Sequence, residues 1–461
     1  MSGRVAMIHF YREAKHEEPM NVFNHTFRQI TLSSMFLVCL CGVTVAADAP
    51  AVSMSTPVPR IERVVPLERD PAVEESFFRE DFEKLSTLKD RFFDVAEGLG
   101  KFSISEADAF DGKKGLDQSY INRQTYDAPD KGSAGWVSRF FGDSPLFASR
   151  IEDKTQVTRI YARWYHKFED GFDAVVDGKI HFPPKTARLR CQETGHRRIY
   201  TVHYWIDNES PEAFIAIERH TTAPGTHREW IPKSVTRFSC GDPENIGRWV
   251  HMELAVTLGD KPRSDHIQAW ADGKLIADIP NDDLSAGWKK TGLTEMMWDA
   301  YWNGGSPKDQ HRYYDALALS QTGPIGPARS GPNPELRLAA GNPKAEAFEV
   351  EVAEGAQKPL KPDTMYDGVP GTYHPLEIDC TVVWQGRVKG ERRLTVDTKN
   401  GVFTGPRAGN VGLDDNALHF VRIRESLGGR WSAWSGWHAG FATVWKSGTG
   451  ERPLPRGYLA R

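Results

Sequence analysis

The sequence predicts an all-β protein built from packed antiparallel sheets. The chain of 461 residues contains 14 Trp, 13 Tyr and 23 Phe beside 41 Gly and 29 Pro, which favours short aromatic strands joined by turns. After Lys101, apolar and polar residues alternate, and no long amphipathic helix pattern follows. Roughly a dozen such strands in about 250 residues exceed what one open sheet usually holds, so we expect a two-sheet sandwich.

The clearest strand patterns alternate apolar and polar positions between turn residues. They lie at 157–168, 198–206, 213–220, 248–258, 266–272 with 274–279, 295–302 and 311–320. Asp272-Gly273 stands between two alternating segments, and an Asp-Gly pair in that setting predicts a two-residue hairpin turn.

The charge balance excludes some classes of partner. The chain has 58 Lys and Arg against 62 Asp and Glu, a formal net charge of -4, and 39% hydrophobic residues. A nucleic-acid-binding surface needs an excess of basic residues, and a polytopic membrane protein needs several long apolar runs. We therefore expect a soluble protein that binds no nucleic acid and meets no membrane beyond its targeting segment.

The N-terminal region carries that targeting segment. Residues 34–47 read SMFLVCLCGVTVAA, an apolar run preceded by Arg28 and followed by small residues suited to cleavage. This pattern predicts a secretory signal within 1–49, and a start at Met20 would give a signal of ordinary length. An uncleaved anchor is the alternative. The expected location is secreted, periplasmic or cell-surface.

Three cysteines remain after such a cleavage, an odd number in a chain bound for an oxidising compartment. Cys191 and Cys240 fall at strand ends of the same candidate domain. They either form a disulfide or are two small buried side chains.

Proline-rich stretches divide the rest of the chain. Residues 50–73 are polar and punctuated by proline, which predicts a linker ahead of a large domain at 74–327. The run GPIGPARSGPNPE predicts a second linker at 328–344 and a smaller sandwich at 345–447. Residues 448–461 are expected to form a loose tail.

Three segments of the large domain resemble one family. They are Gly247-Arg248-Trp249-Val250, the hairpin IQAWADGKLI and the closing strand HRYYDALALS. Together they resemble the core of concanavalin A-like jelly rolls, and they are similar to laminin-G-type domains and to polysaccharide lyases that cleave alginate or glucuronan. The resemblance covers roughly 78–327 and implies a two-sheet antiparallel jelly roll. This scaffold serves lectins, lyases and inert modules alike.

Strand alternation places polar and aromatic side chains together on some sheet faces. Arg163, Tyr165 and Lys167 share one side of their strand, and His203 and Trp205 share one side of another. Aromatic rings stack on sugar rings, and Arg and Lys pair with uronate carboxylates or sulfates. Such faces therefore suit an acidic polysaccharide.

A lyase needs more than a binding face. Cations must neutralise the uronate carboxylate, a His or Tyr must remove the C5 proton, and a Tyr commonly protonates the leaving oxygen. Because lyases of this fold use residues of these types, the resemblance implies the catalytic candidates His203, Tyr165, Arg163, Lys167 and Arg190. The candidates for contacting sugar are Trp205, Trp249 and His251.

A glycoside hydrolase is disfavoured, because no strand carries the E-x-D-x-E carboxylate pattern of the retaining glucanases of this fold. The jelly-roll resemblance also implies a structural Ca²⁺ where the first and last strands meet. Glu80 and Asp315 are the candidate ligands, and the alternative is that each accepts hydrogen bonds within a turn.

The C-terminal module resembles a fibronectin type III domain, with a Trp-Ser-x-Trp-Ser motif at 431–435. Arg422 and Arg424 alternate onto one side of their strand. Trp431 and Trp434 can interleave with them as a cation–π ladder, so the expected role of these four residues is structural.

The sequence thus predicts a secreted protein whose jelly roll binds an acidic or sulfated polysaccharide. One alternative is a polysaccharide lyase that uses the same sheet face. A second is an adhesive or structural module with no glycan ligand.

Overall fold

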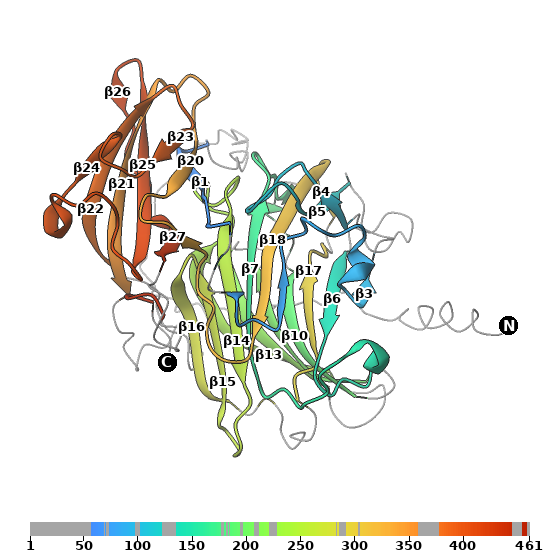
Figure 1. The fold of residues 1–461 in the computed structure, drawn as a ribbon. Coiled ribbons are helices and arrows are strands. Elements are labelled where there is room, and N and C mark those ends of the chain that lie inside the picture. The colour runs from blue at the N-terminus through green and yellow to red at the C-terminus, as the bar shows by residue number, and fades with distance from the viewer. Residues whose placement is uncertain are drawn as a thin grey trace, which may run out of the picture. The chain divides into compact units, whose positions relative to one another are not determined.

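The computed structural model describes most of the chain after Ala51 (Figure 1). The described residues are 57–68, 70, 73–96, 102–121, 135–176, 179–180, 183, 185–193, 197–206, 212–220, 228–282, 284, 292–302, 305–357, 378–444 and 454–458. The predicted signal at 1–49, with Met20, lies outside them. Within the described ranges, no helix is long and apolar enough to cross a membrane.

The predicted jelly roll is formed by two antiparallel sheets. One sheet follows the order β16-β15-β14-β7-β18-β5-β4, with β2 paired to β18 (Figure 1). Its strands are β2 (Phe78–Glu80), β4 (Phe102–Ser105), β5 (Gly115–Tyr120), β7 (Arg159–Phe168), β14 (Val250–Thr257), β15 (Asp265–Ala271), β16 (Lys274–Asp282) and β18 (Gln310–Ser320). We call it the eight-stranded sheet.

The second sheet follows the order β13-β12-β11-β10-β17-β6-β3. Its strands are β3 (Asp94–Val95), β6 (Trp136–Phe140), β10 (Lys185–Glu193), β11 (Arg197–Ile206), β12 (Glu212–His220), β13 (Arg228–Ser239) and β17 (Glu295–Asp299). We call it the seven-stranded sheet. Two 3-10 helices, η2 (Leu88–Asp90) and η3 (Ala148–Arg150), and the short pair β8 (Val175–Val176) and β9 (Lys179–Ile180) lie outside both sheets.

Alternation along the strands builds the core between the sheets. Trp164 of β7 and Tyr204 of β11 both point inward, and their rings meet edge to face with centroids 5.4 Å apart. The residues that alternate with them point to the outer faces, among them Arg163 on one sheet and His203 on the other. The chemistry predicted from the sequence is therefore divided between two outer faces.

The Asp272-Gly273 hairpin is confirmed. It joins β15 to β16, and both residues have positive φ, 50° at Asp272 and 75° at Gly273. A two-residue turn with positive φ at both positions matches the right-handed twist of the flanking strands.

A smaller sandwich follows in the chain. Its larger sheet follows the order β19-β27-β25-β21-β22-β24, with β26 on β25, and its smaller sheet the order β1-β20-β23. The strands are β1 (Arg60–Val64), β19 (Arg329–Ser330), β20 (Glu335–Ala339), β21 (Ala347–Gln357), β22 (Ile378–Lys389), β23 (Arg393–Thr395), β24 (Gly401–Phe403), β25 (Leu418–Leu427), β26 (Arg430–Trp431) and β27 (His438–Thr443), with the 3-10 helix η5 (Gly405–Arg407).

Two segments expected to be linkers contain strands of this sandwich, so the linker prediction is wrong for them. β1 lies within 50–73, and β19 and β20 lie within 328–344. Ile61 and Leu336 are fully buried in the core of the smaller sandwich. The pairing of β1 with β20 shifts register between Ile61 and Arg63, and such a bulge disrupts the alternation by which a strand is recognised.

The expectation of a loose tail is also wrong for 454–458. The Tyr458 ring stacks on Trp270 of β15 with centroids 5.8 Å apart, and its hydroxyl donates to a Glu253 carboxylate oxygen at 2.8 Å. Tyr458 is buried and completes the outer face of the eight-stranded sheet.

The arginine–tryptophan ladder is present on β25. The Arg424 guanidinium lies 5.2 Å from the ring centre of Trp431 and 4.6 Å from that of Trp434. Arg422 lies 4.9 Å from Trp434 and 4.6 Å from Trp437, which extends the ladder by one ring. The ladder stiffens one side of the smaller sandwich.

Candidate functional site

The sheets separate the five catalytic candidates. β7 pairs with β14 and β18, so Arg163, Tyr165 and Lys167 lie on the outer face of the eight-stranded sheet. β11 pairs with β10 and β12, so His203 and Arg190 lie on the outer face of the seven-stranded sheet. The five candidates therefore do not form one site. The alternation of each strand is visible in the sequence, but the sheet to which the strand belongs is not.

The chain's own groups already engage the three candidates on β7. Arg163 pairs with Asp70 at 2.8 Å, and the Tyr165 hydroxyl accepts the Ala328 amide at 2.7 Å.

Lys167 makes two ion pairs, at 2.9 Å with Glu62 and 2.7 Å with Asp108. Glu62 lies in β1, ahead of the jelly-roll strands, and Asp108 lies in the connection between β4 and β5. The contacts hold these segments on the sheet, and we therefore assign Arg163, Tyr165 and Lys167 a structural role.

The two sugar-binding candidates on β14 and just before it are engaged in the same way. The Trp249 indole donates to Asp108 at 3.1 Å, and the Gly273 amide donates to His251 Nδ1 at 3.2 Å. Both side chains are buried. Trp205, the third sugar-binding candidate, lies on β11 and faces the other way.

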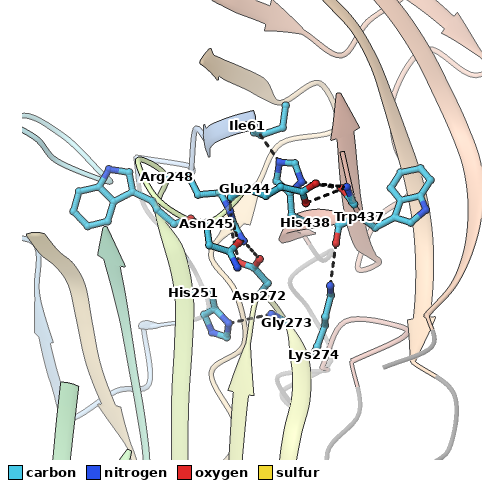
Figure 2. A network of polar contacts seen from close by, with 12 residues as sticks. Ile61, Glu244, Asn245, Arg248, His251, Asp272, Gly273, Lys274, Trp437 and His438 are labelled. Atoms are coloured by element: carbon cyan, nitrogen blue, oxygen red, sulfur yellow. Dashed lines mark hydrogen bonds and ion pairs between the residues drawn. The ribbon is translucent and has the colours of Figure 1, made fainter. Parts of the chain in front are cut away.

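The segments that carry the family resemblance lie where the jelly roll contacts the smaller sandwich. Figure 2 shows the fully buried Arg248 reaching Asp272 and Asn245, with an Nη1 to Oδ1 distance of 3.1 Å to Asp272. Lys274, in the same hairpin, donates to the Trp437 carbonyl at 2.9 Å (Figure 2).

One further contact crosses in the same place, where the Gly436 amide donates to Glu244 at 2.9 Å. Beside it, within the smaller sandwich, the Ile61 amide donates to His438 Nε2 at 3.0 Å (Figure 2). The Gly-Arg-Trp and Asp-Gly-Lys segments thus form a joint between the sandwiches.

The outer face of the seven-stranded sheet has a different character. Arg190 lies 3.2 Å from Glu295 of β17, and Ser138 of β6 donates to the same carboxylate at 2.7 Å. Arg188, two residues away on the same face, pairs with Asp299. Burial lowers the pKa of Arg188, although Asp299 acts in the opposite direction.

Aromatic rings lie beside these cations. The Lys185 ammonium is 3.6 Å from the ring centre of Trp205, and the Arg188 guanidinium is 5.4 Å from it. Trp230 of β13 lies 5.0 Å from Trp205 and 4.9 Å from the imidazole of His203, centroid to centroid. A cation on an indole face is a favourable cation–π contact.

His203 and Glu218 form a buried pair in the middle of this face. His203 Nε2 lies 3.2 Å from Glu218 Oε2, and His203 is fully buried. Burial lowers the pKa of His203 to about 3, although Glu218 acts to raise it. The imidazole is therefore neutral at pH 7, and a proton on Nε2 that is donated to Glu218 leaves the Nδ1 lone pair open.

Several buried polar atoms of this face have no hydrogen-bond partner within the described part of the chain. They are Nε of Arg188 and Arg190, Oγ1 of Thr201, Nδ1 of His203 and Nε1 of Trp205 and Trp230. Buried polar groups are nearly always paired, and each exception costs about 1–3 kcal/mol. A group of exceptions on one face indicates a place for a polar ligand. We call Lys185, Arg188, Arg190, Thr201, His203, Trp205, Glu218 and Trp230 the β11 cluster.

Sequence reasoning named three of these eight residues as candidates, Arg190, His203 and Trp205, and missed the other five. Arg188 was visible through its alternation with Arg190. Glu218 and Trp230 become neighbours of His203 only through strand pairing, since Glu218 stands opposite Thr201 on one side and Trp230 on the other. No local pattern encodes that register.

The metal and disulfide expectations concern other places. Glu80 accepts the Phe82 amide at 2.8 Å and pairs with Arg91, and Asp315 accepts the Phe110 and Asp111 amides. No group of three or more His, Cys, Asp or Glu residues that could hold a metal occurs in the described ranges. The Ca²⁺ site stays a prediction.

Cys191 and Cys240 do not form a disulfide, and the alternative of two buried side chains holds. Both thiols lie inside the jelly-roll core. Burial raises the pKa of Cys240 to about 12, which keeps it protonated and unreactive.

A cavity of about 800 Å³ lies away from the β11 cluster, beside β1 and β20. Its cations include Arg60 and Lys308. Arg60 pairs with Asp170, and Lys308 donates to the Gly171 carbonyl at 2.7 Å. The described lining of this cavity contains no tryptophan ring on which a sugar could stack, so the β11 cluster is the better candidate site.

No family model and no curated protein matches this sequence. Solved structures resemble part of it. A Chlorella virus alginate lyase aligns with a TM-score of 0.38 and 14% identity over 53% of this chain and 99% of its own. The alginate lyase Aly36B gives 0.33 and 12% over 59% and 99%, and a Griffonia simplicifolia lectin 0.31 and 11% over 53% and 98%. Values this low carry no argument about function, which rests on the β11 cluster.

Proposed function

We propose that the β11 cluster binds an acidic polysaccharide. The observation that carries the proposal is the group of buried, unpartnered donors beside two tryptophans and three cations. The tryptophan rings suit the apolar faces of sugar rings, and the donors suit carboxylates, sulfates and hydroxyls. The predicted signal segment would deliver the protein to polymers outside the cytoplasm.

The ion pairs on this face leave donors for a ligand. A guanidinium has five N–H donors. Arg190 uses Nη1 toward Glu295, while its Nε has no partner in the described part of the chain. A uronate carboxylate would share the Arg190 guanidinium with Glu295. A hydrogen bond from the unpartnered Nε of Arg190 to this carboxylate would then contribute to binding.

Direct binding measurements test this proposal. We expect the mature protein to bind at least one of alginate, polygalacturonate and a sulfated glycan, and Trp205→Leu to weaken that binding about tenfold through lost stacking. Trp434→Leu, in the ladder of the smaller sandwich, is the matched control and should bind normally. Equal binding by both variants, or no binding to any polymer, would overturn the assignment.

A second candidate function is β-elimination at the same face, and the His203–Glu218 pair is the observation that favours it. In that reaction Nδ1 of His203 takes the C5 proton of a uronate. The C5–H electron pair becomes the C4–C5 double bond, the C4–O bond breaks, and the leaving oxygen gains a proton from an acid. Glu218 would stabilise the imidazolium formed in this step.

Ultraviolet absorbance of the unsaturated product tests the lyase. His203→Ala should abolish the signal, whereas His311→Ala should keep it. His311 is a suitable control because it also contacts a carboxylate, Asp117 at 2.9 Å, but lies on β18. If the absorbance does not rise but the protein still binds the polymer, the protein binds polysaccharide without cleaving it. If the absorbance does not rise and no polymer is bound, a structural module without a glycan ligand is favoured.

A further inference from the structure

A second arginine ladder lies at one edge of the jelly roll and alternates with phenylalanine. The Arg150 guanidinium is 4.2 Å from the ring centre of Phe93, and Arg139 is 4.3 Å from the same ring. Arg139 is also 5.3 Å from Phe78, and Arg91 is 5.2 Å from Phe78. The ladder spans β6, β2 and the segments around η2 and η3.

In the arginine–tryptophan ladder of the smaller sandwich, carboxylates neutralise the arginine charges. In this second, arginine–phenylalanine ladder they do not neutralise all of them. In the smaller sandwich, Arg424 bonds Glu349 at 2.7 Å and Arg422 bonds Glu351 at 2.6 Å. Each positive charge has its own carboxylate, which fits a purely structural role.

Within the described ranges, Arg91 alone among the arginines of the arginine–phenylalanine ladder has an ion pair, with Glu80 at 3.1 Å. Arg139 and Arg150 donate to the backbone carbonyls of Arg91 and Lys89 at 2.9 and 3.0 Å. Neither makes an ion pair with a carboxylate within the described ranges.

The three charges are close enough to affect one another. Burial, then Arg91 and Arg150, lower the pKa of Arg139 to about 10, although Glu152 acts to raise it. Nε of Arg139 is buried and has no hydrogen-bond partner among the residues that the structure describes. Like charges held together cost free energy, which a bound anion would offset.

An exposed aromatic ring accompanies this charge. Phe77, next to Phe78 in the chain, is 43% exposed, although most large apolar side chains in the described ranges are buried. Its ring meets Phe141 edge to face at 5.7 Å, two residues after Arg139 on the same strand and its extension. Cations and an open ring therefore lie at one edge.

We propose that this edge binds an anionic sugar unit, with its carboxylate or sulfate on Arg139 and Arg150 and its ring face on Phe77. The choice of an acidic glycan rests on the function proposed above, whereas the anion site itself does not. An exposed ring beside paired guanidiniums suits a charged pyranose better than a bare phosphate. The edge would extend the contact of one polymer chain beyond the β11 cluster.

The test measures dissociation constants for alginate and for heparin with the full mature protein. Arg139→Gln combined with Arg150→Gln should weaken binding about tenfold and reduce its salt dependence. Arg150→Gln alone should weaken it about threefold, and because Arg150 is exposed this variant does not depend on core packing. Arg424→Gln, in the neutralised ladder, is the control and should bind normally.

Phe77→Ser separates the ring from the charge. It should weaken binding of both polymers and leave competition by inorganic sulfate unchanged. Unchanged polymer binding by Arg150→Gln and the double variant would overturn the proposal. Binding only to phosphatidylserine vesicles, lost in the double variant, would overturn it in favour of a lipid surface.

Different variants test the β11 cluster and the edge site, so the failure of one proposal can be distinguished from the failure of the other. Loss of binding in Trp205→Leu, with none in the arginine variants, would leave the β11 cluster and remove the edge site. The reverse result would support the edge site and contradict the β11 cluster.

Discussion

The outer faces of the two jelly-roll sheets carry similar side chains in different circumstances. Each has arginine, lysine, histidine, glutamate and large aromatic residues. On the eight-stranded sheet, Glu253 accepts the Ile325 and Gly326 amides at 2.7 and 2.8 Å, and Arg163 has its own carboxylate. On the seven-stranded sheet, polar atoms of the β11 cluster are buried without hydrogen-bond partners in the described ranges, and Nε of Arg163 and Nε2 of His251 on the eight-stranded sheet are too. Contacts from other segments of the chain, such as Asp70 and Tyr458, and not the side-chain composition, mark the eight-stranded face as structural.

Removing the Arg248–Asp272 ion pair beside the joint should have the largest effect on the free energy of unfolding. Arg248→Ala leaves the Asp272 carboxylate buried without its cation, and we expect a loss of about 3–5 kcal/mol in the free energy of unfolding. Chemical denaturation measures it, with the exposed Arg430→Ala as control. A loss below about 1 kcal/mol would mean that this face tolerates an unpaired charge and that the contrast between the faces is wrong.

Lowering the pH should have the next largest effect on the free energy of unfolding, because burial keeps some histidines neutral. The pKa of His203 is lowered to about 3 from its ordinary value of 6.5, so between these values the unfolded chain binds a proton that the folded chain does not. The contribution of neutral His203 to the free energy of unfolding is therefore fully present above pH 6.5. It is lost as the pH falls toward 3, by at most about 1.4 kcal/mol per pH unit.

The variant His203→Asn isolates this contribution. Its free energy of unfolding should fall less steeply between pH 6.5 and 4 than that of the parent protein, by up to about 1.4 kcal/mol per pH unit. Parallel curves would show that His203 is not held neutral. The same slope is expected from His438, also at about 3, on the opposite side of the joint.

The smallest effect is expected from one hydroxyl. Tyr458→Phe removes a hydrogen bond to the buried Glu253 and should cost about 1–1.5 kcal/mol, because two backbone amides still satisfy that carboxylate. Thermal unfolding would detect it. No change would show that residues 454–458 add packing only.

Local patterns predicted much of the fold. Turn chemistry located the Asp272-Gly273 hairpin, and alternation predicted the order of Arg422 and Arg424 in their ladder. Both features need only near neighbours in sequence. β1 escaped prediction because a register shift between Ile61 and Arg63 breaks the alternation.

The candidate site depended on distant pairing. Alternation correctly placed His203 and Trp205 on one side of β11 and Arg163 on one side of β7. It could not show that Asp70 would meet Arg163, 93 residues later in the chain, or that Glu218 would face His203 across a strand pair. Such contacts are set by topology, which a single sequence does not display.

The joint in Figure 2 also bears on how the protein is made. The Ile61 amide meets His438 across 377 residues of chain, and Glu253 receives Tyr458 across 205. Contacts this remote slow folding, because a long loop must close before they form. During synthesis the part of the eight-stranded sheet's outer face that Tyr458 covers stays exposed until residue 458 has left the ribosome. Glu253 lacks the Tyr458 hydroxyl until then, and that interval is the time when the chain most needs protection from aggregation.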